Sequence, residues 1–134
     1  MPELTEILQQ WKNDPAFMSN VTRWEVIPAS AGSFRDFPAY LEPQLIEALR
    51  GRGIEQLYSH QAAAIDCVNE GHHTVVVTPT ASGKTLCYNL PVVSAMIKDS
   101  TSRALYLFPT KALSQDQVAE LRDLTAGLST KLNC

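Results

Sequence analysis

The chain has 134 residues, of which 45% are hydrophobic and 19% charged, and its formal net charge is −3. The apolar fraction excludes a mainly disordered chain. The mild acidity excludes a protein that binds polyanions through net positive charge, so a nucleic-acid site can only be a local patch. No apolar run is long enough to span a membrane, and the polar N-terminus does not resemble a secretory signal. Three widely spaced cysteines without a paired motif favour free thiols in a reducing, cytoplasmic setting.

The first forty residues predict an N-terminal arm that is partly helical and partly irregular. Apolar side chains recur at helical spacing over residues 3–12, and Asp14-Pro15 ends that helix. Residues 15–40 are rich in proline and predict irregular chain, with at most one extended piece over residues 23–27. Scattered aromatic residues in this stretch indicate an arm that packs onto something else.

Residues 41–134 predict alternating helices and strands. Apolar periodicity indicates four helices, over residues 41–50, 59–70, 84–98 and 112–126. Two apolar runs, residues 74–77 and 103–108, predict fully buried strands of the parallel type. Strands that alternate with helices form βαβ units, so we expect an α/β fold in which helices flank a parallel sheet. Ser114 and Gln117 predict a capping box near the start of the last helix.

The most informative stretch is the loop Thr78-Pro79-Thr80-Ala81-Ser82-Gly83-Lys84-Thr85, which follows a predicted strand and opens a predicted helix. In that context the backbone N–H groups and the helix N-terminus form a site for phosphate groups. Gly83 permits close approach of the backbone, Lys84 supplies a mobile positive charge for the β- and γ-phosphates, and Thr85 offers its hydroxyl to Mg²⁺. The general pattern begins with Gly, and Thr78 stands at that position here. We predict that the amide hydrogens of this loop converge on a pocket that holds a polyphosphate.

This loop resembles motif I of the superfamily-two DEAD/DEAH-box helicases. The segments LYSHQ, TPTASGKTLCYNLP and LYLFPTKALSQDQ are most similar to a DNA-helicase branch whose members carry a cysteine-rich zinc region near the far C-terminus, which these residues lack. The resemblance runs from about Leu41 to Leu124. It implies that residues 41–134 are the first part of a P-loop NTPase (RecA-like) domain, preceded by the arm 1–40. It also implies ATP and Mg²⁺ as ligands, bound by residues 78–85 with Thr85 reaching Mg²⁺ beside the nucleotide.

Gln61, in the LYSHQ segment, occupies the place of the glutamine with which this family reads adenine. A primary amide both donates and accepts, so it can pair with N6 and N7 of adenine. The alternative is a solvent-facing helix glutamine. The neighbouring Tyr58 fits stacking on adenine and simple packing equally well.

Downstream, Pro109-Thr110-Lys111-Ala112-Leu113 resembles motif Ia, the segment with which this family contacts the nucleic-acid backbone. A Thr hydroxyl, a Lys charge and helix N–H groups are suitable partners for phosphate oxygens. The resemblance therefore implies that Thr110 and Lys111 bind nucleic acid, with single-stranded DNA as the expected substrate.

The sequence contains neither Asp-Glu-x-His nor Asp-Glu-Ala-Asp, so the acidic pair that holds Mg²⁺ in this family is absent, as is the second RecA-like domain with its arginine finger. Loss of such a finger alone costs on the order of 10³–10⁵ in rate. We therefore expect a chain truncated before motif II, which needs the remainder of the helicase chain and is inactive alone.

Two other interpretations remain open. The chain could be a non-catalytic nucleotide-binding or interaction module, or a decayed gene product, that ends naturally at Cys134. A small-molecule kinase is disfavoured because such kinases begin close to their phosphate loop, whereas 77 residues precede Thr78 here. The pair His72-His73 lacks further ligands, which favours a solvated turn over a metal site.

Overall fold

The computed structural model describes residues 3–28, 31–79 and 82–129. Two residues of the predicted phosphate loop, Thr80 and Ala81, lie outside this part of the chain. The chain divides into two compact units, Met1–Ala31 and Gly32–Cys134, each described here by itself.

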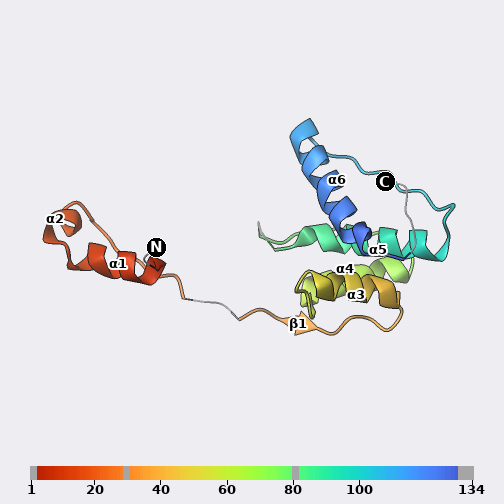
Figure 1. Ribbon diagram of the computed structural model, residues 1–134, viewed down its shortest axis with the longest axis horizontal. Helices are drawn as coiled ribbons and strands as arrows, with labels where there is room; N and C mark the ends of the chain where they lie inside the picture. The colour runs from red at the N-terminus through yellow and green to blue at the C-terminus, as the bar shows by residue number, and fades with distance from the viewer. Residues whose placement is uncertain (1–2, 29–30, 80–81, 130–134) are drawn as a thin grey trace. The chain divides into compact units, whose positions relative to one another are not determined.

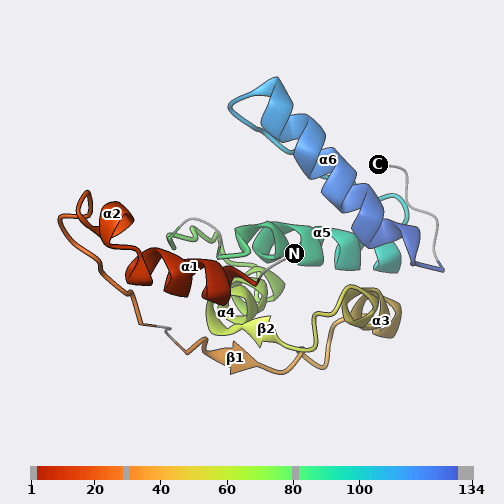
Figure 2. The ribbon, with the colours of Figure 1, turned by 60° about the vertical axis from the view of Figure 1, so that its left-hand side comes forward.

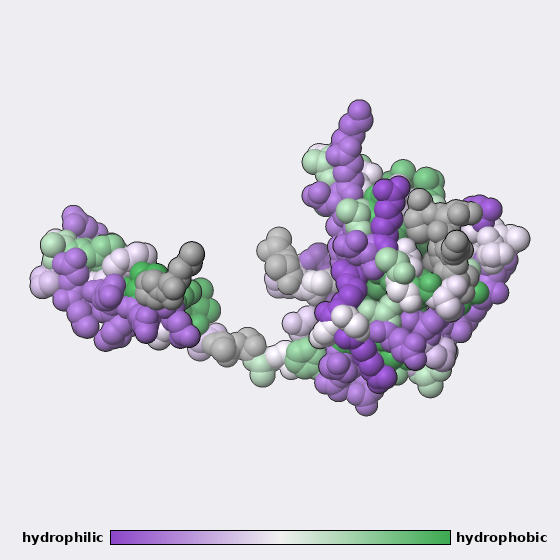
Figure 3. All heavy atoms as spheres, in the orientation of Figure 1, coloured by the Kyte–Doolittle hydropathy of each residue, from purple (hydrophilic) through white to green (hydrophobic). Residues whose placement is uncertain are grey.

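The first unit consists of helices α1 (Leu4–Asn13) and α2 (Pro15–Met18) followed by irregular chain (Figure 1). The helix predicted over residues 3–12 is confirmed. Helix α2 was not predicted, because Asp14-Pro15 was interpreted only as a stop signal. It also starts a helix: the Asp14 carboxylate accepts hydrogen bonds from the N–H groups of Ala16 and Phe17, at 2.8 and 3.3 Å. Hydrophobic residues stay at the surface of this unit, whose described residues include none that is buried (Figure 3).

The second unit contains helices α3 (Pro43–Gly51), α4 (Ser59–Asn69), α5 (Lys84–Lys98) and α6 (Lys111–Ala126). These are the four predicted helices, and their observed ends lie within two residues of the predicted ones. Helix α5 lies between α6 on one side and α3 with α4 on the other (Figures 1 and 2). None of the helices in the described part of the chain has the length and apolar character that a membrane span requires.

The core of the second unit forms where these helices meet around α5. Leu90 and Val93 of α5 are fully buried, as are Leu45 and Leu49 of α3, and Leu124 of α6 is nearly so. Their spacing of three or four residues places each set on one helical face. The helical layer is therefore a packed structure that holds the start of α5, and with it the candidate site, in place.

The sheet differs from the prediction. Among the described residues, the one ladder is antiparallel and very short, and it pairs β1 (Phe34–Arg35) with β2 (Leu57–Tyr58). Residues 74–77 and 103–108 form no ladder with each other or with any described residue. Val75 and Val77 are each 88% exposed, so the predicted burial of these segments is wrong for this chain. A strand needs a neighbour that accepts and donates its backbone hydrogen bonds, and the described residues provide none for these two segments.

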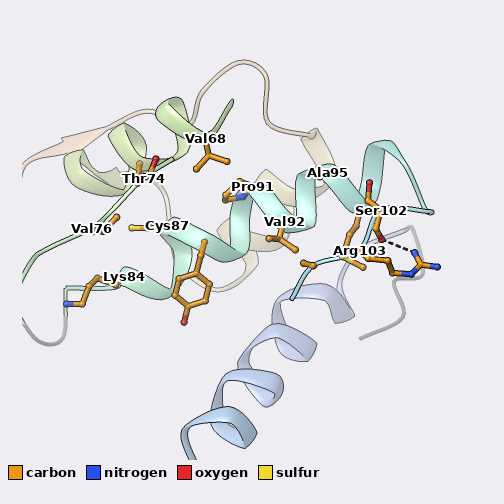
Figure 4. A pocket seen from close by; sticks show the side chains of 14 residues that line it. Val68, Thr74, Val76, Lys84, Cys87, Pro91, Val92, Ala95, Ser102 and Arg103 are labelled. Carbon is orange, nitrogen blue, oxygen red and sulfur yellow. Dashed lines mark hydrogen bonds between the residues drawn. The ribbon is translucent and has the colours of Figure 1, made fainter. Parts of the chain in front are cut away.

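A cavity of about 600 Å³ lies beside α5, between the two segments that were predicted to be strands (Figure 4). Val76 and Ala104 line it from those segments, and Cys87, Pro91 and Val92 line it from α5. Its walls are mainly apolar. The predicted sheet would pack against this same side of α5.

A hydrogen-bonded anchor joins the start of the second unit to α4. The Tyr40 hydroxyl donates to one carboxylate oxygen of Asp66 at 2.6 Å, and Arg35 donates to the other at 3.2 Å. Burial and the hydrogen bond to the Asp66 carboxylate raise the pKa of Tyr40 well above its usual range. The phenol therefore stays a donor at all ordinary pH values and keeps α4 fixed to the chain that precedes it.

The helical core generates a stability prediction. Leu90→Ala should lower the free energy of unfolding by about 2–5 kcal/mol, because the change leaves a cavity among packed side chains. Leu105→Ala is the matched control: Leu105 is 85% exposed, so the expected loss is below about 0.5 kcal/mol. Urea denaturation followed by circular dichroism measures both. Equal losses would show that residues 103–108 are covered in solution and would contradict the arrangement described here.

Candidate phosphate-binding site

Gly83 marks the junction between the candidate loop and helix α5, and it is the N-cap of that helix. Its φ of 71° and ψ of 31° lie in the left-handed region, which a residue without a side chain adopts at no steric cost. A Cβ atom at this position would lie 2.6 Å from Nε2 of Gln61. The backbone turn therefore favours glycine here, and a side chain at this position would also displace the Gln61 amide.

The ammonium group of Lys84 lies inside the loop. Nζ donates to the backbone oxygens of Thr78 and Pro79, at 3.0 and 2.6 Å, and contacts the hydroxyls of Thr78 and Ser82, each at 3.2 Å. Figure 4 shows the Lys84 side chain directed toward the loop and away from Val68 and Pro91. The charge is thus held among oxygen atoms of the loop and is not buried in the apolar interior.

Two hydroxyl groups complete the described part of the loop. Oγ1 of Thr78 and Oγ of Ser82 are hydrogen-bonded at 2.6 Å, which draws the two ends of the loop together. Thr85, in the first turn of α5, is half-buried, and its hydroxyl makes no hydrogen bond to another described residue. A hydroxyl at this place is available to a ligand at the helix N-terminus.

Gln61 connects α4 to the loop. The residue is 3% exposed, so the alternative of a solvent-facing glutamine is wrong. Its Nε2 donates to the backbone oxygen of Gly83 at 2.8 Å, and its Oε1 accepts from the N–H of Tyr58 at 2.9 Å. One amide therefore satisfies a donor at the start of α4 and supports the start of α5. Recognition of adenine by this amide stays a prediction.

His60, which is not among the predicted site residues, also contacts the loop. Its Nε2 lies 2.9 Å from the backbone oxygen of Ser82. A carbonyl oxygen can only accept, so this contact assigns the ring proton to Nε2. The position of His60 directly before Gln61, in the first turn of the same helix, is the sequence feature that could have indicated this contact.

Three aromatic rings form a stacked row that ends at His60, next to the phosphate loop. Phe34 and Tyr58 stack with ring centroids 4.8 Å apart, and Tyr58 and His60 stack at 5.7 Å. Tyr58 is 41% exposed. These contacts support the packing role of Tyr58, and its stacking on adenine stays a prediction.

Thr110 and Lys111 lie at the start of α6. The Thr110 hydroxyl accepts from the N–H of Leu113 at 3.2 Å and caps the helix. The predicted capping box of Ser114 and Gln117 is therefore wrong. The side chain of Lys111 is exposed, and no described hydrogen bond or ion pair joins Thr110 or Lys111 to the phosphate loop.

Helix α5 connects the two candidate regions. The Tyr88 hydroxyl, one turn after Lys84, donates to Oε1 of Gln117 in α6 at 2.5 Å. The Tyr106 hydroxyl donates at 3.0 Å to Oδ1 of Asn89, whose residue is buried. The helix that begins at the phosphate loop is thus hydrogen-bonded to α6 and to the segment that leads into it.

The donor set suits a polyphosphate with Mg²⁺. A helix N-terminus, an ammonium group and two hydroxyls would face the ligand, and these groups bind phosphate oxygens and the metal ion they carry. Groups of three or more His, Cys, Asp or Glu side chains that could hold a metal were not found among the described residues. Nearby, burial raises the pKa of the Cys87 thiol, which leaves Lys84 without an anionic partner from α5 at neutral pH.

The chain is similar to known proteins that are named ATP-dependent helicases. "Uncharacterized ATP-dependent helicase YprA" of Bacillus subtilis is 47% identical over 121 residues, which are 90% of this chain and 16% of that protein. "ATP-dependent helicase hrq1" of Schizosaccharomyces pombe is 33% identical over 97% of this chain and 12% of its own length. The chain therefore spans less than a fifth of the length of these curated relatives.

Solved structures agree with this result. The crystal structure of the DUF1998 helicase MrfA bound to DNA matches 99% of this chain and 18% of its own, with a TM-score of 0.81 and 43% identity. The same helicase bound to DNA and AMPPNP matches 97% of this chain, with a TM-score of 0.81 and 44% identity.

A family profile described as DEAD/DEAH box helicase matches residues 58–134, which include the phosphate loop, helix α5 and the Thr110–Lys111 segment. The chain belongs to the DEAD/DEAH box helicase family and contains part of its RecA-like domain.

Proposed function

We propose that this chain is the ATP- and DNA-binding front part of an ATP-dependent DNA helicase. In this proposal residues 41–134 form the first part of the ATP-binding domain, and residues 1–40 form an accessory arm. The observation that carries it is the position of the Lys84 ammonium, which α5 holds inside the loop within 3.2 Å of four oxygen atoms.

Residues 78–85 bind the phosphates of ATP. Lys84 exchanges the backbone oxygens of Thr78 and Pro79 for phosphate oxygens, which are stronger partners because they carry charge. Thr85 gives its hydroxyl to Mg²⁺. Gln61 recognises adenine, for which its amide exchanges the hydrogen bonds it makes to Gly83 and Tyr58. ATP supplies the phosphoryl group whose hydrolysis drives the motor. The AMPPNP-bound structure of MrfA supports this assignment.

Thr110 and Lys111 hold the backbone of single-stranded DNA. Both are exposed at the N-terminus of a sixteen-residue helix, where backbone N–H groups and the helix dipole favour an anion. The DNA-bound structures of MrfA support DNA as the nucleic acid. A further relative, "ATP-dependent DNA helicase Hel308" of Pyrococcus horikoshii, is 36% identical over 62% of this chain.

Replacement of Lys84 tests the nucleotide site. Lys84→Ala should weaken binding of a fluorescent ATP analogue about 10- to 100-fold, because a hydrogen-bonded charge contributes about 1.5–3 kcal/mol. Fluorescence anisotropy with and without Mg²⁺ measures the change. Thr85→Ala is the control for the metal: it should reduce the Mg²⁺-dependent part of binding and spare the rest. Equal binding by the wild type and Lys84→Ala would show that the loop is not the site.

Replacement of Lys111 tests the DNA contact. Lys111→Ala should weaken binding of single-stranded DNA of any sequence and lower the slope of log K against log salt by about 0.7, the value of one phosphate contact. Lys98→Ala, at the far end of α5, removes the same charge elsewhere and should leave the slope unchanged. A slope equal to that of the wild type in Lys111→Ala would remove this residue from the interface.

We also expect binding without turnover. The 134 residues lack the acidic pair of motif II, which holds Mg²⁺ and orients the attacking water, so phosphate release from ATP should not exceed that of Lys84→Ala. A coupled phosphate assay with saturating single-stranded DNA measures this rate. Hydrolysis above the Lys84→Ala background would contradict the expected inactivity and leave the binding proposal intact.

A further inference from the structure

Two neighbouring side chains of α4 hold two consecutive carbonyl groups of the phosphate loop. His60 Nε2 lies 2.9 Å from the backbone oxygen of Ser82, and Gln61 Nε2 lies 2.8 Å from the backbone oxygen of Gly83. Both contacts come from the first turn of α4.

Because the peptide unit is planar, a contact that holds its C=O group also sets the direction of its N–H group. In a trans peptide, the C=O of one residue and the N–H of the next point in opposite directions from a rigid plane, and no cis peptide is found in the described chain. A Ser82 oxygen held toward α4 therefore turns the N–H of Gly83 away from α4. In the same way, the held Gly83 oxygen turns the N–H of Lys84 away from it. Neither N–H donates to another described residue.

We propose that His60 is a positioning residue of the phosphate site. Through its hydrogen bond to Ser82 it fixes the plane of the Ser82–Gly83 peptide, and thereby directs the N–H of Gly83 toward a bound phosphate. This inference rests on the ATP-binding function proposed above and adds one residue to it.

The surroundings of His60 suit this role. Its ring stacks against Tyr58 with an angle of 15° between the planes, which restricts rotation of the imidazole. The carbonyl acceptor selects the tautomer in which Nε2 carries the proton. The donor is therefore fixed in direction before a ligand arrives, and the cost of ordering the Ser82–Gly83 peptide on binding is reduced.

Two substitutions separate the donor from the ring. His60→Phe keeps an aromatic ring against Tyr58 and removes the donor, whereas His60→Gln removes the ring and keeps a donor of similar reach. The probes are inorganic tripolyphosphate and adenosine, measured by isothermal titration calorimetry. We expect His60→Phe to weaken tripolyphosphate binding about three- to tenfold, the effect of one neutral hydrogen bond, and to leave adenosine binding unchanged. His60→Gln should stay within about twofold of the wild type for both probes.

A purely structural role for His60 gives a different pattern. Equal losses in His60→Phe and His60→Gln, or tripolyphosphate binding by His60→Phe that matches the wild type, would overturn the proposal. If Lys84→Ala binds tripolyphosphate as tightly as the wild type, the proposed function is overturned instead. This comparison involves no His60 variant, so the two failures are distinguishable.

Nuclear magnetic resonance of the wild-type protein tests the same role of His60 without any substitution. The ¹⁵N chemical shift of His60 Nε2 should be that of a protonated ring nitrogen. The Gly83 amide resonance should shift when tripolyphosphate is added. An unprotonated Nε2, or a Gly83 amide that does not respond to bound tripolyphosphate, would overturn the role assigned to His60.

Discussion

The described site depends on the contact between α4 and the backbone of Gly83. The Gln61 amide donates to the Gly83 oxygen at 2.8 Å, at a position where Gly83 adopts a left-handed backbone and a Cβ atom would lie 2.6 Å from the same Nε2. That turn starts α5 and sends the Lys84 side chain back into the loop. The buried Gln61 has both ends of its amide paired, so its position is well determined. The contact between Gln61 and Gly83 thus lies where the loop, the start of α5 and the Lys84 side chain meet.

Helix α5 connects the phosphate loop to the rest of the second unit through packing and hydrogen bonds. Leu90 and Val93 place it in the core, while Tyr88 and Asn89 hydrogen-bond to Gln117 and Tyr106. The phosphate loop and the start of α6 are therefore attached to one helix, although no described hydrogen bond joins them directly. In the proposed motor, this shared helix would let a change at the nucleotide reach the segment that holds DNA.

The helical layer forms without the sheet because a helix satisfies its backbone hydrogen bonds internally, whereas a strand depends on its neighbours. Most of residues 74–77 and 103–108 are accordingly exposed, and a mainly apolar cavity of about 600 Å³ remains beside α5. The parallel sheet predicted for these segments is not formed by the described residues. The chain covers 16% of the helicase YprA and 18% of the DNA-bound MrfA chain.

The sequence by itself determined helices α1 and α3 to α6, the glycine turn that starts α5, and the family. Each of these depends on residues that are close together in the chain: apolar periodicity for α3 to α6, and Gly83-Lys84-Thr85 for the start of α5. The tertiary structure decided what depends on distant residues. It paired Gln61 and His60 with the loop, and it left Val75 and Val77 exposed. Local hydrogen bonds follow from local sequence, whereas side-chain partners and strand pairing follow from which segments meet in space.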